Sequence, residues 1–82
     1  EYIPDFVAET DTTIYMIETK ARTDVNTQEV QAKANSAARW CKHASAHAVE
    51  VGTKAWKYLL LPHDEVSESK RLSDYLRFEV QI

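Results

Sequence analysis

The sequence predicts an α/β domain with a mixed sheet, built in the order strand, strand, helix, strand. Two short apolar segments, residues 3–7 and 14–20, are rich in β-formers and are separated by a polar turn. A long stretch with apolar residues at spacings of three and four then indicates a helix. A nearly continuous apolar run, residues 56–61, is typical of a strand covered on both faces, which a helical crossover would place parallel to its neighbour.

The first two segments are expected to form an antiparallel hairpin. Residues 10–13 are polar and are interpreted as its turn, and counting outward from that turn places Asp5 opposite Glu18. Paired residues share one face of a sheet, and the period of two adds Lys20 to that face. We therefore predict that these three side chains converge. A register slip of one residue would move Asp5 to the opposite face from Glu18.

This combination of side chains suits metal-dependent hydrolysis. Two neighbouring carboxylates repel each other unless a cation lies between them, and Mg²⁺ prefers oxygen ligands and keeps several waters. A nearby ammonium would orient or deprotonate one of those waters, or stabilise negative charge that develops in a transition state. Asp5, Glu18 and Lys20 thus indicate a phosphodiester-cleaving site.

Three segments occur in a fixed order, YIPDF at residues 2–6, IETKAR at 17–22 and YLLLPHDE at 58–65. The first two contain Pro-Asp and Glu-Thr-Lys, which are similar to the Pro-Asp…(Asp/Glu)-x-Lys signature of a large nuclease superfamily. That signature alone is degenerate. The ordered set is more specific, and it resembles the endonuclease domain of the restriction (Res) subunit of type III restriction enzymes over residues 2 to about 66.

The resemblance implies a restriction-endonuclease-like core and an endonuclease that hydrolyses DNA with Mg²⁺, for which Mn²⁺ can substitute. It implies that Asp5 and Glu18 bind the metal together with the backbone carbonyl of Thr19, and that Lys20 assists the attacking water. Two departures weaken the match. Ala21 stands where relatives commonly have Gly, and an acidic ligand from a preceding helix would lie upstream of the sequence.

Two basic residues are the expected DNA contacts. Arg22 directly follows the second segment, and Lys33 lies in the helical turns nearest the loop after Lys20. A solvated charged face is the alternative for such residues. The resemblance also implies three partners, namely DNA, a modification subunit, and a helicase or translocase in the rest of the parent chain. ATP would act only through that helicase or translocase. The resemblance implies the cytoplasm of a prokaryote and no membrane.

Composition sets limits on this interpretation. Eighty-two residues with 44% hydrophobic and 28% charged side chains predict a single domain over residues 1–82, and we expect it to be part of a longer chain because no initiator Met is present. The formal charge of −3 argues against DNA binding by this domain alone. The single glycine excludes a glycine-rich phosphate loop.

The second half of the chain predicts one long and one short helix. Asn26 is the expected N-cap of a helix that runs to about His47. Its apolar stripe consists of small residues that let its backbone approach the sheet, with Val30, Ala34, Ala37, Cys41, Ala44 and Ala48 as its members. Gly52 is expected at the chain reversal after this helix. Ser67 or Ser69 is expected to cap a short C-terminal helix, and residues 78–82 alternate like a final short strand.

Other chemically active residues are assigned no site. Cys41 lies in the helical stripe and is expected to be a small buried hydrophobe. His43 and His47 are four apart but lack a third ligand, and His63 as a general base is less favoured than a simple turn. Two alternatives to the nuclease hypothesis stay open: a catalytically inactive nuclease-fold module for nucleic-acid binding or assembly, and an unrelated small α/β interaction domain.

Overall fold

The computed structural model describes residues 4–82 and has three strands in one sheet. The strands lie in the order β1 (Phe6–Glu9), β2 (Thr13–Lys20) and β3 (Ala55–Pro62). The central strand, β2, pairs antiparallel with β1 and parallel with β3. The helix α1 (Gln28–Val51) connects β2 to β3. The predicted α/β class, mixed sheet and element order are therefore confirmed.

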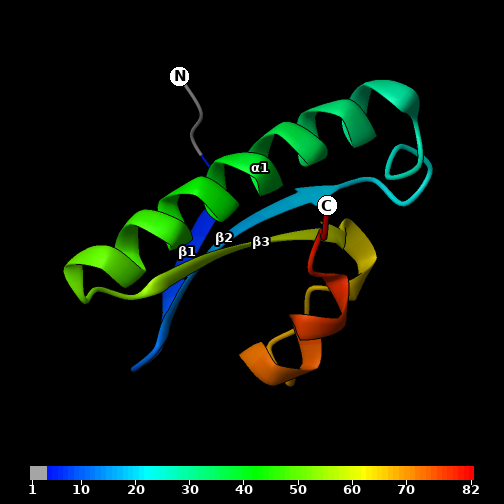
Figure 1. Cartoon of the computed structure of the whole chain (residues 1–82). Coiled ribbons are helices and arrows are strands. Elements are labelled where there is room, and N and C mark those ends of the chain that lie inside the picture. Colours follow the sequence, from blue (N-terminus) through cyan, green and yellow to red (C-terminus); the bar gives the residue numbers. More distant parts are fainter. Residues whose placement is uncertain (1–3) are drawn as a thin grey trace.

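α1 lies over one face of the sheet and the C-terminal segment over the other (Figure 1). Because side chains alternate between the two faces, each face has a small core. On one face α1 packs over buried Met16, Tyr58 and Leu60. The opposite face carries buried side chains of β2 and β3, namely Tyr15, Ile17, Leu59 and Leu61. These are covered by the C-terminal segment of the chain, so that β3 is buried on both faces, as its apolar run predicts.

The hairpin has the predicted register but shifted strand limits. Phe6 pairs with Ile17 and Val7 with Met16, so the next positions outward are Asp5 and Glu18. β1 begins at Phe6, and the part of the first expected strand before residue 4 lies outside the described residues.

The hairpin turn is shorter than expected. The backbone N–H of Thr10 donates to the carbonyl of Thr13 (2.8 Å), and Thr13 is already the first residue of β2. The Thr10 hydroxyl accepts the N–H groups of Thr12 (3.3 Å) and Thr13 (3.0 Å). The Thr10 side chain thus closes the turn by satisfying backbone donors.

The predicted limits of the long helix were wrong by one residue at its start and by about a turn at its end. Its N-cap is Thr27 and not Asn26, because the Thr27 hydroxyl accepts the N–H of Val30 (3.4 Å). The helix continues past His47 until Gly52, whose φ of 74° is left-handed. Gly52 donates its N–H to the carbonyl of Ala48 and ends the helix, which confirms the predicted reversal.

The C-terminal region differs from the prediction in helix type and capping. It forms two 3₁₀-helices, η1 (His63–Glu65) and η2 (Leu72–Phe78). The apolar residues Leu72, Tyr75 and Phe78 are three apart, which matches the roughly three residues per turn of a 3₁₀-helix and turns all of them toward the sheet. No serine caps η2. Instead the Asp74 carboxylate accepts the N–H of Arg71 (2.8 Å).

The predicted final strand is reduced to a single bridge. Glu79 pairs with Leu59, and the N–H of Val80 donates to the carbonyl of Tyr58 (2.9 Å). The chain end therefore lies along the outer edge of β3 without forming a ladder.

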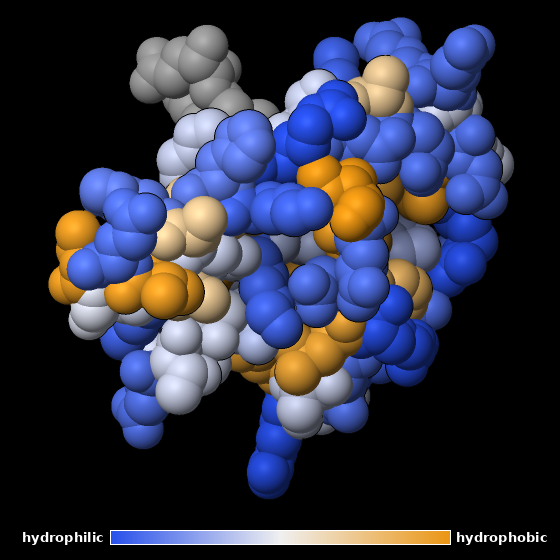
Figure 2. Space-filling model, viewed as in Figure 1, coloured by the Kyte–Doolittle hydropathy of each residue, from blue (hydrophilic) through white to orange (hydrophobic). Residues whose placement is uncertain are grey.

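The surface seen in Figure 2 is mostly hydrophilic, with small hydrophobic patches. One patch lies at the C-terminal end of α1, where Val49 and Val51 are exposed. Within residues 4–82, no helix combines the length and the hydropathy needed to cross a membrane.

Close packing of α1 on the sheet depends on small side chains, and the predicted stripe is largely confirmed. The buried residues of α1 are Ala34, Ala37, Ala38, Cys41 and Ala48, whereas Ala44 is only half-buried. We expect Ala34→Leu to lower the free energy of unfolding by about 1–3 kcal/mol, because Ala34 is 1% exposed and extra methylenes would force α1 away from β2 and β3.

Urea unfolding measures this change. Ala46→Leu is the matched control, since Ala46 is exposed on the same helix. It should have little effect, and equal destabilisation by both substitutions would contradict the packing argument.

Candidate functional site

Asp5 is fixed at the end of the hairpin by the neighbouring strand. Its Oδ2 atom accepts the backbone N–H of Thr19 (2.9 Å) and the Thr19 hydroxyl (3.3 Å). Because β1 begins only at Phe6, the Asp5 side chain supplies the acceptor that a strand carbonyl would otherwise provide. The carboxylate is thereby held at the end of β2 by Thr19, whose side chain lies on the face opposite Glu18 and Lys20.

The backbone N–H and carbonyl of Thr19 point toward the Asp5 side of β2. In a paired strand the N–H and the C=O of one residue point to the same neighbour. Since the Thr19 N–H meets Asp5, its carbonyl also faces the Asp5 side of β2, beyond the end of the β1 ladder. Two carboxylate side chains and one carbonyl thus lie at this end of the hairpin.

Glu18 is held from the opposite side by a buried tyrosine. Glu18 lies on the α1 face of β2, and its Oε1 atom accepts a hydrogen bond from the hydroxyl of Tyr58 on β3 (3.3 Å). Tyr58 is 1% exposed. It lies diagonally across from Glu18, since Glu18 pairs with Leu60 in the parallel ladder. The sequence analysis missed this residue, although a tyrosine in an apolar strand normally needs a partner for its hydroxyl.

A groove of about 1110 Å³ lies between α1 and the hairpin, and we call it the α1–β1 groove. Its lining residues are Pro4, Val7, Met16, Glu18 and Lys20 from the hairpin, Ala32, Lys33, Ser36, Ala37 and Trp40 from α1, and Trp56 from β3. Asp5 is not part of the lining but directly follows Pro4. Glu18, Lys20 and Lys33 therefore meet in one groove although they come from two elements.

The two expected DNA contacts have different surroundings. Lys33 lines the α1–β1 groove and makes an exposed ion pair with Glu29, one helical turn away (3.4 Å). Such a pair contributes little to stability and exchanges partners readily. Arg22 lies in the loop after β2, where its Nε and Nη2 atoms donate to both carboxylate oxygens of Asp64 (2.8 and 2.7 Å). A DNA contact by Arg22 would compete with this fork-shaped pair.

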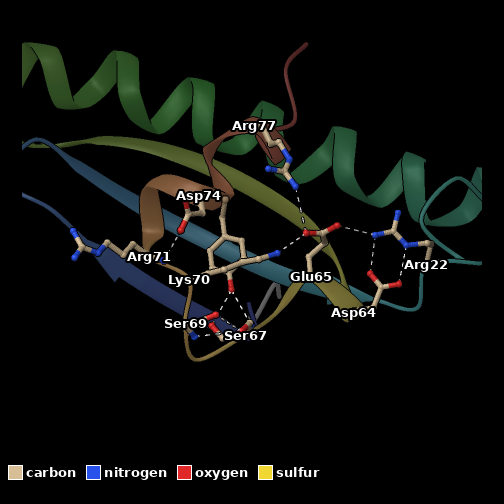
Figure 3. Close-up of polar contacts among 10 residues, drawn as sticks. Arg22, Asp64, Glu65, Ser67, Ser69, Lys70, Arg71, Asp74 and Arg77 are labelled. Atoms are coloured by element: carbon tan, nitrogen blue, oxygen red, sulfur yellow. Dashed lines mark hydrogen bonds and ion pairs between the residues drawn. The ribbon is translucent and has the colours of Figure 1, made fainter.

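Arg22 and Asp64 belong to a larger ionic network (Figure 3). Arg22 also donates a hydrogen bond to Oε2 of Glu65 (3.0 Å). Oε1 of Glu65 accepts hydrogen bonds from Lys70 (2.7 Å) and Arg77 (3.3 Å). The network ties the loop after β2 to η1 and η2, next to the carboxyl ends of the parallel strands.

Both carboxyl groups are easier to ionise than usual. The hydrogen bond from Arg22 is the largest cause that lowers the pKa of Asp64, and the hydrogen bond from Lys70 is the largest cause that lowers the pKa of Glu65.

The remaining candidates lie away from this end. Cys41 is buried, which confirms its predicted place in the core, and desolvation together with the charge of Glu79 raises the pKa of its thiol to about 11. His43 and His47 are exposed on α1. Among residues 4–82, no three His, Cys, Asp or Glu side chains form a cluster able to hold a metal ion.

The chain matches no protein-family model, no curated protein and no solved structure.

The ionic network predicts a pH dependence. We expect Asp64 and Glu65 to titrate below their ordinary range and Arg22→Gln to raise the pKa of both. Because the folded-state pKa values are lowered, the network stabilises the fold above the ordinary carboxyl pKa, and this contribution disappears as the pH falls through the lowered values. Carboxyl ¹³C chemical shifts followed by NMR titration measure both groups.

The matched control is Arg77→Gln, which removes the same charge but contacts only Glu65 of the two. It should raise the pKa of Glu65 alone. An unchanged Asp64 titration in Arg22→Gln would show that the pair does not form in solution.

Proposed function

We propose that this chain is a Mg²⁺-dependent endonuclease domain that hydrolyses DNA, with a restriction-endonuclease-like core as in the Res subunit of type III restriction enzymes. One observation carries the proposal: Glu18 and Lys20 lie on the same face of β2 and line one groove, and the Asp5 carboxylate bonds Thr19, the residue between them. The order of the three signature residues along the chain supports it.

The donor set at this end fits Mg²⁺. Asp5, Glu18 and the carbonyl of Thr19 offer only oxygen atoms, and Mg²⁺ is commonly bound through one or two carboxylates while it keeps several waters. The lack of a third acidic ligand among residues 4–82 is compatible with that preference. When bound, Mg²⁺ would supply a more acidic water and neutralise charge on the phosphate.

The protein's own cations complement these carboxylates. Lys20 follows Glu18 by two positions on the same face of β2 and lines the same groove, so its ammonium would orient water and stabilise charge on a phosphate. Lys33 reaches the groove from α1 and offers a second phosphate contact. Both act as point charges, which suits a phosphodiester of any sequence.

The proposal is tested first by titrating Mn²⁺ into the chain by isothermal calorimetry. We expect binding in the wild type and its loss in Asp5→Asn/Glu18→Gln, because the double variant replaces both carboxylates by neutral amides. The matched control is Asp11→Asn/Glu68→Gln, which removes two negative charges from exposed residues elsewhere and should still bind. Supercoiled-plasmid nicking in Mg²⁺ completes the test, with Lys20→Ala expected to slow nicking roughly 100-fold.

Equal Mn²⁺ binding by all three proteins, or none by the wild type, would refute the metal site. Binding without nicking by the wild type would favour the alternative of a catalytically inactive module that keeps the fold.

Tyr58 provides an independent test because it orients Glu18. We expect Tyr58→Phe to weaken Mn²⁺ binding about tenfold, the effect usual for removing a group that positions a metal ligand. The substitution keeps the ring and removes only the hydroxyl. Calorimetry measures the affinity, and circular dichroism establishes that the variant is folded.

Tyr15→Phe is the control. Tyr15 is also buried, but it lies on the opposite face of the sheet and should leave metal affinity unchanged. If both substitutions weakened binding equally, the loss would reflect general destabilisation and not the orientation of Glu18.

A further inference from the structure

One end of the α1–β1 groove holds the charged side chains Lys33, Lys20 and Glu18, and the other end is aromatic. Lys33 and Trp40 both line the groove, and their separation of seven residues on α1 corresponds to about 10 Å along the helix axis. On the opposite wall of the groove, an aromatic and a basic residue follow each other in the same direction. Trp56 pairs with Ile14 near the start of β2, whereas Lys20 is the last residue of β2.

Trp40 presents an indole that the fold leaves half-exposed but holds in place. It is 52% exposed, and its ring meets that of Trp56 edge to face, with centroids 5.2 Å apart and an angle of 88° between planes. This contact orients Trp40 and leaves much of its surface in water. A large, oriented aromatic ring in a groove is a common anchor for a ligand.

We propose that the α1–β1 groove binds an unpaired strand of nucleic acid, with a base stacked on Trp40 and backbone phosphates beside Lys33 and Lys20. Aromatic platforms alternating with basic residues are the usual means of holding single strands. At the spacing of about 3.4 Å per nucleotide that each strand of a duplex has, roughly three nucleotides span the 10 Å between the two ends. The proposal rests on the proposed nuclease only for placing the phosphate to be cut, which would belong to a strand locally separated from its complement, and binding is measurable without cleavage.

The groove favours an unpaired strand over other occupants. A base inside a duplex has both faces stacked on its neighbours and cannot lie on a protein ring. An apolar protein segment would cover Trp40 but would also desolvate the lysine ammonium groups without offering them an anion. Phosphates offer that anion, and the exposed pair of Lys33 with Glu29 is weak enough to exchange for it.

The indole N–H region of a ¹H–¹⁵N NMR spectrum tests the proposal directly. The sequence contains two tryptophans, and Trp40→Phe identifies which signal belongs to Trp40. The probe is the pentanucleotide dT5, added at low salt with EDTA so that no metal supports cleavage. We expect the Trp40 signal to shift in a saturable manner, and we expect a hairpin duplex at the same concentration to shift it less.

Variants separate stacking from charge. Trp40→Ala should weaken dT5 binding about tenfold, as measured from the remaining backbone signals. Lys33→Gln should weaken binding and reduce its salt dependence. Lys42→Gln is the matched control, because it removes the same charge from α1 at a position that does not line the groove, and it should bind dT5 like the wild type.

The proposal is overturned if the Trp40 signal does not move at millimolar dT5, or if Lys33→Gln and Lys42→Gln bind equally. A Trp40 signal that shifts on diluting the protein alone would show that a second copy covers the groove, and would also overturn it. Plasmid nicking distinguishes the two proposals. Trp40-dependent dT5 binding without nicking supports the groove proposal and refutes the nuclease. Nicking without a shift of the Trp40 signal supports the nuclease and refutes the groove proposal.

Discussion

The pairing of β2 with a strand on each side is the constraint on which the rest of the structure depends. β2 contributes, like β3, to both cores, so its side chains alternate between α1 and the C-terminal segment. The same alternation places Glu18 and Lys20 on the α1 face, where the groove lies. A shift of one residue in either ladder would exchange the faces and would remove both the packing and the site.

Local sequence patterns were sufficient to predict much of the fold and of the candidate site. The polar turn and the β-formers on either side of it were sufficient to predict the hairpin register, and with it the position of Asp5 opposite Glu18. The apolar run before Pro62 predicted a strand buried on both faces. Such features succeed because each depends on neighbours in the sequence or on a simple period of two.

Contacts between distant segments were not predictable in the same way. Tyr58 meets Glu18 across 40 residues, and Arg22 meets Asp64 across 42. Both contacts depend on the register of the parallel ladder, which no turn fixes because a whole helix intervenes. The 3₁₀ form of η2 was missed for a related reason: its apolar spacing of three is also compatible with an α-helix until the sheet to be covered is known.

The different spans of these contacts bear on the order in which the site forms during folding. Asp5 and Thr19 are 14 residues apart and belong to one hairpin, whose closure costs little chain entropy. Tyr58 reaches Glu18 only after α1 has formed and β3 has docked. The bond between Asp5 and Thr19 thus requires only the hairpin, whereas the bond that Tyr58 donates to Glu18 requires the long-range docking of β3. Completion of this site is thus coupled to completion of the whole fold.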